Sequence, residues 1–160
     1  MGRVFMFGDN VDTDQLAPGQ YMRGGIEAIA AHCLEMVRPD FAKVVRPGDV
    51  IVAGRNFGAG SSREQAAEAL KHLGIAGVVA RSFAGIFYRN AINLGLPALV
   101  APEIGGIADG DACALDVEAA GLKVGNGEIA LEPVPDNLRR LLEDGGLVPH
   151  LKKRFAEVRR

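Results

Sequence analysis

Cysteine is scarce in this chain of 160 residues, and its scarcity excludes several classes of protein. Cys33 and Cys113 are the only two, and they stand far apart without a C-x-x-C spacing. Two thiols placed in this way can form neither a disulfide framework nor a tetrahedral metal site. We therefore expect both cysteines to be reduced and structural.

Long apolar runs and an excess of one charge are also missing. No stretch approaches the roughly 20 apolar residues of a membrane span, and the opening MGRVFMFGDN has no signal-peptide core. The 18 Lys and Arg residues nearly balance the 20 Asp and Glu residues, which indicates no broad basic surface for nucleic acid or anionic lipid. These absences predict a cytoplasmic protein that binds neither nucleic acid nor membrane.

The composition that remains is that of an ordinary globular domain. Hydrophobic residues make up 48% of the chain, enough to build a full core at this length. We expect a single domain over residues 1–160, with a basic polar tail from about residue 150. The tail is interpreted as a solvated helix end, because cations complement the dipole there.

Alternating strand-like and helix-like segments predict an α/β fold with a parallel β-α-β-α-β core. Its strands are expected at 48–54, 77–80 and 97–101, with one helix starting at the serines 61–62 and another capped by Ser82. Gly74 and Gly95 are expected to end these helices. A strand at 4–7, a helix at 26–37, two strands around the turn at 125–127 and a helix at 136–146 complete the prediction. Residues 9–21 are expected to form turns rather than helix.

The segment NFGAGSSREQA, residues 56–66, follows a predicted strand, and reactive groups in open α/β sheets collect at this end of the strands. Gly58 and Gly60 would let backbone N–H groups converge on an anion, while the planar guanidinium of Arg63 suits a carboxylate. A capping box from Ser61 to Glu64 is the competing interpretation, but it requires only one hydroxyl. We favour an anion site.

Other catalytic motifs are not met in this segment. A phosphate-binding loop requires Lys where Ser61 stands, and the dinucleotide fingerprint G-x-G-x-x-G fails at Arg63. The nucleophile elbow G-x-S-x-G is missing. The histidines are interpreted as solvated or packed side chains rather than catalytic bases; they are His32, His72 and His150.

Three segments together carry a family resemblance: GDNVDTDQLAPGQYM, NFGAGSSREQA and SFAGIFYRNAINLGL. In this order and spacing they resemble the small subunit of 3-isopropylmalate dehydratase, part of the aconitase superfamily. The resemblance runs from about residue 2 to about residue 150. It implies a swivelling β/β/α three-layer domain of the aconitase fourth-domain type.

The resemblance also implies a partner and a reaction. The partner is a large subunit that carries a 4Fe-4S cluster, in a heterodimer or heterotetramer, and this chain itself would hold no cofactor or metal. The small-molecule substrate is a 2-hydroxy diacid, isomerised between 2-isopropylmalate and 3-isopropylmalate by dehydration and rehydration in leucine biosynthesis. Family members often have cysteine where Ala59 stands, but the family's cluster does not use that position.

Site residues follow from the same resemblance. Ser61 would be the catalytic base in its alkoxide form, which requires N–H groups and a cation nearby. Ser62 would bind the substrate or the Ser61 oxygen, Arg63 would clamp a substrate carboxylate, and Asp14 would join the catalytic site rather than only hold a turn. Asp12 and Thr13 are interpreted as turn formers, and Arg89 and Asn90 as structural partners of the site loops.

Arg23, in QYMRGG at residues 20–25, leaves more than one substrate compatible with the sequence. This segment corresponds to the family's substrate-selecting loop, and an unpaired guanidinium fits an isopropyl pocket poorly. It could instead bind the third carboxylate of a homoaconitase substrate, or point to solvent while Tyr21 and Met22 line the pocket. Homoaconitase or a related 2-hydroxy diacid dehydratase is thus one alternative, and a non-catalytic dicarboxylate-binding module is another.

Overall fold

The strands of the computed structural model, which describes residues 1–159, form one curled sheet in the order β4-β3-β2-β1-β5-β6-β7. Its parallel part contains β1 (Gly2–Met6), β2 (Val50–Ala53), β3 (Gly77–Ala80) and β4 (Ala98–Val100). Its antiparallel part contains β5 (Ala112–Asp116), β6 (Gly121–Val124) and β7 (Gly127–Ala130). The parallel core and the strands around the 125–127 turn are as predicted, whereas β5 was not predicted.

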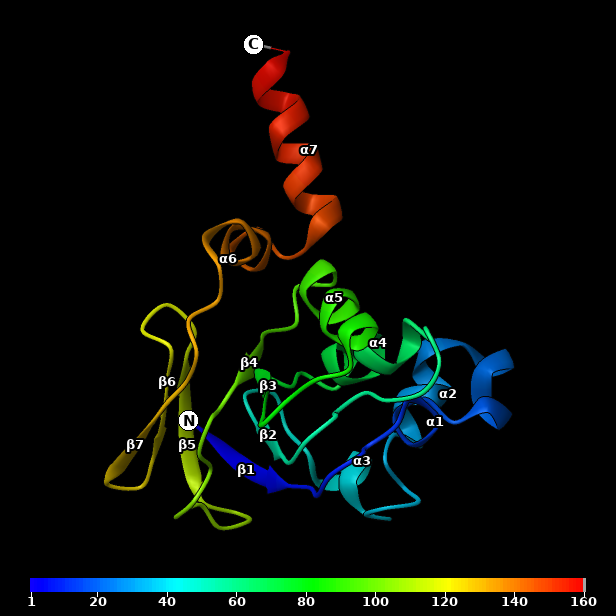
Figure 1. Ribbon diagram of the computed structural model, residues 1–160. Coiled ribbons are helices and arrows are strands. Elements are labelled where there is room, and N and C mark those ends of the chain that lie inside the picture. The colour runs from blue at the N-terminus through cyan, green and yellow to red at the C-terminus, as the bar shows by residue number, and fades with distance from the viewer. Residues whose placement is uncertain (160) are drawn as a thin grey trace.

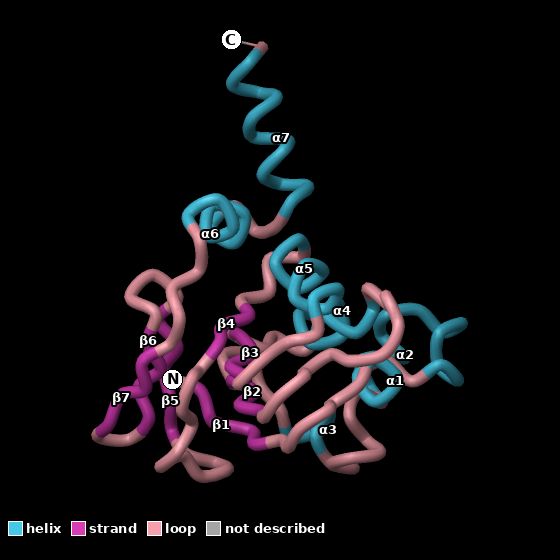
Figure 2. The backbone as a smooth tube through the Cα atoms, viewed as in Figure 1, coloured by secondary structure: helices cyan, strands magenta, loops and turns pink. Residues whose placement is uncertain are grey.

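Helices cover one face of the parallel part, as Figures 1 and 2 show. They are α1 (Thr13–Leu16), the 3-10 helix η1 (Gly19–Gly24), α2 (Gly25–Ala31), α3 (Phe41–Val44), α4 (Gln65–His72) and α5 (Gly85–Asn93). The antiparallel strands lie on the opposite side and give the β/β/α layering that the resemblance implied. The chain ends in α6 (Asp136–Glu143) and α7 (Leu147–Val158).

Two apolar cores hold the three layers together, and β2 serves both because all four of its residues are buried. Ile51 and Ala53 belong to the core beneath the helices, and Val50 and Val52 to the core beneath the antiparallel strands. Successive strand residues point to opposite faces, so a strand covered on both faces must be apolar throughout. This is why the continuous run at 48–54 was a reliable strand signal.

Local side-chain chemistry overturns the prediction that residues 9–21 lack helix. The Asp12 carboxylate accepts a hydrogen bond from the Gln15 N–H at 2.8 Å, and the Gln15 side chain accepts one from the Asp12 N–H at 3.1 Å. This reciprocal capping box starts α1. The predicted helix at 26–37 is too long, because α2 ends at Ala31 and Leu34 adopts a positive φ of 59°.

The two predicted serine caps are also wrong. Helix α4 begins at Gln65 after Glu64, with no side-chain cap, so Ser61 and Ser62 lie in the loop before it. Helix α5 begins at Gly85, and Ser82 instead accepts a hydrogen bond from the Asn56 N–H at 2.8 Å. Neither the serines before α4 nor Ser82 therefore caps a helix. Gly74 and Gly95 do follow the helix ends, with positive φ values of 82° and 80°.

The last helix, α7, projects away from the rest of the structure beyond α6 (Figure 1). Its direction is fixed at its base, where the chain turns through Gly145 and Gly146 with positive φ values of 88° and 123°. Within residues 1–159, none of the helices is long and apolar enough to cross a membrane.

Candidate active site

The loops that follow the parallel strands lie side by side and continue the sheet pairing. Gly58 donates its N–H to the Val11 carbonyl at 2.7 Å, and Thr13 donates to the Ala59 carbonyl at 2.8 Å. The loop after β2 is also joined to the loop after β3, because Phe57 donates to the Ser82 carbonyl at 3.1 Å. Backbone pairing therefore brings residues 11–13 against residues 58–61.

Aromatic packing fixes the middle loop from below. Phe57 is fully buried and meets the ring of Phe87 edge to face, with centroids 5.2 Å apart. Gly58 has a positive φ of 85°, and a Cβ added there would lie 2.2 Å from a Phe87 ring atom. Only glycine satisfies both the backbone angle and this close approach, so the first glycine of the motif positions the loop.

Ser61 lies at the centre of a small hydrogen-bonded group. Its hydroxyl oxygen is 3.1 Å from the hydroxyl oxygen of Thr13 and accepts the Arg63 N–H at 3.3 Å. The Ser61 N–H donates to the Thr13 hydroxyl oxygen at 3.1 Å. Because Thr13 accepts there, its own proton can be donated to the Ser61 oxygen, which then receives two donors.

Arg63 and Asp14, both predicted for the site, contact each other. The Arg63 Nη1 donates to the Asp14 carboxylate at 3.2 Å and to the Ala17 carbonyl at 2.7 Å. The same Asp14 oxygen accepts from the Gly19 N–H at 3.3 Å. Asp14 thus orients the guanidinium and connects it to η1, the segment that carries Arg23.

Ser62 also lies in this loop and is exposed. Its carbonyl accepts a hydrogen bond from the Asn90 side chain on α5 at 3.3 Å, so the interpretation of Asn90 as a structural partner is confirmed. For Arg89 that interpretation is wrong, because its side chain donates to the Gly85 carbonyl of its own helix at 3.5 Å.

Arg23 is exposed in η1. Within the described chain, no hydrogen bond or ion pair joins it to Ser61, Ser62 or Arg63. Its neighbours Tyr21 and Met22 pack against the core beneath the helices, and the Tyr21 ring stacks on His32 with centroids 3.6 Å apart. The segment is therefore anchored by its apolar residues, and the guanidinium remains at the surface.

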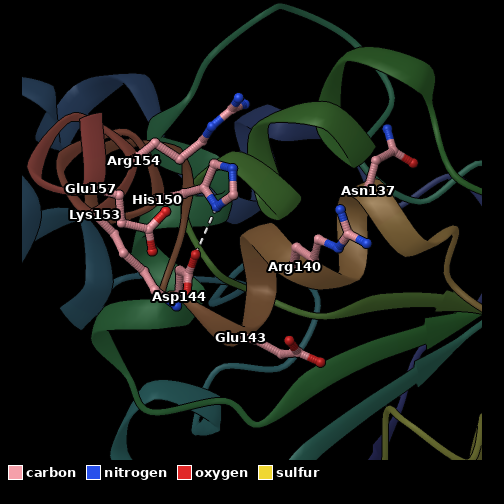
Figure 3. A pocket seen from close by; sticks show the side chains of 8 residues that line it. All are labelled: Asn137, Arg140, Glu143, Asp144, His150, Lys153, Arg154 and Glu157. Atoms are coloured by element: carbon pink, nitrogen blue, oxygen red, sulfur yellow. Dashed lines mark hydrogen bonds and ion pairs between the residues drawn. The ribbon is translucent and has the colours of Figure 1, made fainter. Parts of the chain in front are cut away.

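The site is an open surface rather than a cavity, since Asp14, Ser61 and Ser62 are all exposed. A cavity of about 440 Å³ lies elsewhere, between α6 and α7 (Figure 3). It is lined by charged and polar side chains: Asn137, Arg140, Glu143, Asp144, His150, Lys153, Arg154 and Glu157. Across it His150 and Asp144 are joined at 2.7 Å, and none of the predicted site residues lines it.

The described residues do not fit an iron–sulfur cluster. Among residues 1–159, no three His, Cys, Asp or Glu side chains are grouped to hold a metal ion. Burial raises the pKa of the Cys33 thiol far above its ordinary value and that of Cys113 to about 11, whereas cluster ligands must be thiolates. Both cysteines belong to the apolar cores.

Thr13 is the site residue that sequence reasoning missed. It was interpreted as a turn former. Its exposed fraction is only 3%, and it contacts both the hydroxyl and the N–H of Ser61. The signal was its place beside Asp14 in DTDQ, but only the pairing of the two loops brings it to Ser61.

Fold and site together define a domain of the aconitase C-terminal type. Residues 36–103 match the aconitase C-terminal domain family. The chain is 50% identical, over 95% of its length and 90% of the relative's, to the methanogen homoaconitase small subunit of Methanothermobacter thermautotrophicus. It is 49% identical, over 95% and 94%, to 3-isopropylmalate dehydratase small subunit 1 of Thermotoga maritima.

A solved structure gives the same result. The crystal structure of 3-isopropylmalate dehydratase (leuD) from Methanocaldococcus jannaschii superposes with a TM-score of 0.91, at 47% identity, covering 97% of this chain and 94% of that one. The chain therefore belongs to the 3-isopropylmalate dehydratase small-subunit family of the aconitase superfamily.

Proposed function

We propose that this chain is the small subunit of a heteromeric hydro-lyase that interconverts 2-isopropylmalate and 3-isopropylmalate in leucine biosynthesis. The observation that carries the proposal is the environment of Ser61, whose hydroxyl oxygen faces the Thr13 hydroxyl at 3.1 Å and the Arg63 N–H at 3.3 Å. The names of the relatives, most of which are 3-isopropylmalate dehydratase small subunits, support the same reaction.

Ser61 is proposed to remove the carbon-bound proton of the substrate. A serine hydroxyl is a weak acid, so its alkoxide must be stabilised by donors that are already in place. The Arg63 N–H and the Thr13 hydroxyl are such donors, and Thr13 is held by its own bond to the Ser61 N–H. The proton then resides on the Ser61 oxygen until rehydration returns it to the substrate.

Arg63 and Ser62 are proposed to bind the substrate. Arg63 uses its Nη1 on Asp14 and Ala17, which leaves the other guanidinium nitrogens to donate to a substrate carboxylate in the planar arrangement that arginine offers. The exposed Ser62 hydroxyl would donate to the substrate beside it. Asp14 holds Arg63 in position, so its role in catalysis acts through that guanidinium.

The large subunit is proposed to complete the site. The exposure of Ser61 and Asp14 supports this, because a substrate bound here would otherwise remain in water. In the family, the 4Fe-4S cluster of the large subunit supplies the Lewis acid that polarises the departing hydroxyl. The stoichiometry expected is a heterodimer or heterotetramer.

Reconstitution tests this function. We expect the purified chain to bind no iron and to show no dehydration of isopropylmalate until a cluster-bearing large subunit is added. Iron analysis and the absorbance of the alkene intermediate measure the two outcomes. Turnover by the chain alone would refute the heteromer, and tight binding of isopropylmalate without any turnover in the reconstituted complex would instead support a dicarboxylate-binding module.

Homoaconitase is the second candidate function, and the exposed Arg23 together with the methanogen homoaconitase relative favours it. Arg23 lies in η1, whose first residue, Gly19, donates to Asp14. A guanidinium at this position could bind the distal carboxylate of a tricarboxylic acid, whereas an isopropyl group gives it no partner.

The substitution Arg23→Leu distinguishes the two substrates. In the reconstituted enzyme, we expect catalytic efficiency on homoaconitate to fall roughly 10-fold or more, with isopropylmalate unchanged or improved. Arg55→Leu is a control, because Arg55 is an exposed arginine whose backbone N–H, rather than its guanidinium, contacts Asp9. An unchanged ratio of efficiencies for Arg23→Leu would show that the choice is made elsewhere.

A further inference from the structure

Helix α7 has an apolar side that the rest of the protein leaves uncovered. Val148, Phe155 and Val158 are 61%, 63% and 83% exposed. With Leu147 and Leu151 they fall at spacings of three and four, which places all five on one arc of the helix. A soluble monomer normally buries such an arc.

The polar side of α7 makes the contacts with α6. His150 Nδ1 lies 2.7 Å from the Asp144 carboxylate, and Lys153 Nζ lies 3.3 Å from the same carboxylate. Figure 3 shows these side chains facing α6 across the cavity between the two helices. Ion pairs therefore fix α7 with its apolar arc outward, and Figure 1 shows the helix extending into open space.

Basic residues flank the apolar arc. At 100° per residue, Arg154 borders one side, and Lys152 and Arg159 border the other. Two copies of α7 paired face to face would bring these cations together in either orientation, which is destabilising. The surface that α7 fits is therefore apolar with an acidic rim.

A groove of this description exists on the same chain. It has a volume of about 230 Å³ and is lined by Pro97, Val117, Glu118, Arg139, Leu142 and Glu143. Arg139, its only cation, is already paired with Asp136 at 3.2 Å and Glu143 at 3.6 Å. Glu118 is exposed and has no partner in the described part of the chain, so the rim remains acidic.

We propose that α7 of one copy docks into this groove on a second copy, and that the second copy returns the same contact. The groove includes α6, and α6 and α7 lie at the same end of the molecule (Figure 1). Both halves of a reciprocal, two-fold symmetric contact are therefore on one side, as such a dimer requires. Apolar burial provides the stability of this dimer, and the opposite charges at the rim provide its register.

The oligomeric state of the purified chain tests the proposal. Sedimentation of the wild type is expected to show a concentration-dependent dimer. Phe155→Glu should raise the dissociation constant roughly 30-fold or more, as expected for a lost apolar anchor, and Glu118→Arg should raise it by a smaller factor. Glu157→Gln, on the face toward α6, is the matched control and should not change it. Circular dichroism checks that each variant is folded.

Removal of the flanking charges distinguishes the possible occupants. The double change Lys152→Gln with Arg154→Gln should weaken a dimer in which α7 enters an acidic groove, because the attraction is lost, and it should strengthen one in which two α7 helices pair, because the repulsion between their cations is lost. A monomeric wild type, or a dimer insensitive to Phe155→Glu or Glu118→Arg, overturns the proposal. If Phe155→Glu instead weakens binding to the large subunit, or to vesicles of phosphatidylcholine and phosphatidylserine, that surface is the occupant.

Discussion

The loops around Ser61 and the helix α7 use polar and apolar residues in opposite ways. In the site loops, polar groups such as Ser61 and Ser62 are exposed, while backbone pairing and the packing of the buried Phe57 on Phe87 hold the loop in place. In α7, ion pairs lie against the protein and apolar residues face outward. The first arrangement suits the small-molecule site that we propose, and the second suits the docking that we propose for α7.

The largest expected effect is the loss of turnover in Ser61→Ala, which changes the site loops and leaves α7 untouched. The change removes the proposed base and should lower turnover of the reconstituted enzyme by about 100-fold to 10,000-fold. Folding and assembly with the large subunit should be nearly unchanged, because Ser61 is exposed and caps no helix. Steady-state kinetics and gel filtration measure the two quantities.

Phe155→Glu is the control from the other region. It lies outside the catalytic machinery, so turnover per assembled site should equal that of the wild type. Near-normal turnover in assembled Ser61→Ala would remove this serine from the role of base.

Gly58→Ala tests whether the site loop is as rigid as its packing indicates. The new Cβ would lie 2.2 Å from a Phe87 ring atom, at a φ of 85°. Left-handed strain and overpacking together should lower the free energy of unfolding by about 2 to 4 kcal/mol, measured by urea denaturation. Gly105→Ala, where a Cβ meets nothing within 4 Å, should change it by less than about 0.5 kcal/mol. Equal stability of the two variants would contradict the packing argument.

The smallest effect concerns the base of α7. Hydrogen bonds from His150 and then Lys153 hold the pKa of Asp144 below its ordinary value. A carboxyl of lowered pKa stabilises the folded state above its unfolded pKa, about 3.9, and this contribution is lost as the pH falls through the lower folded value. At neutral pH, Asp144→Asn should therefore speed amide hydrogen exchange in α7 and not in α5.

The difference between wild type and Asp144→Asn should shrink below about pH 4, where the carboxylate of the open state begins to take up a proton, and it should vanish once the pH falls below the lowered pKa of the folded state. Asp136→Asn, on the exposed side of α6, is the matched control and should not affect α7. A difference in α7 exchange that persisted unchanged into acid would show that the charge of Asp144 does not hold the helix.

The sequence by itself determined the parallel core and the place of the proposed site. The run at 48–54 had to be a strand covered on both faces because it is apolar throughout, and the motif that follows it had to emerge at the carboxyl end of the sheet. Ser61 and Arg63 were predicted there as an anion site from the glycines, the hydroxyls and the guanidinium of the segment, and the family resemblance then supplied their proposed roles.

Only the tertiary structure decided what those residues contact. Thr13 meets Ser61 across 48 positions of sequence, and Asp14 meets Arg63 across 49. Such partners depend on how neighbouring loops pair beyond the strands, which no local pattern encodes. The outward direction of α7 was equally beyond the sequence. Its basic and apolar residues can be read from the sequence, but which of them meet the protein is seen only in the structure, where His150 and Lys153 contact Asp144.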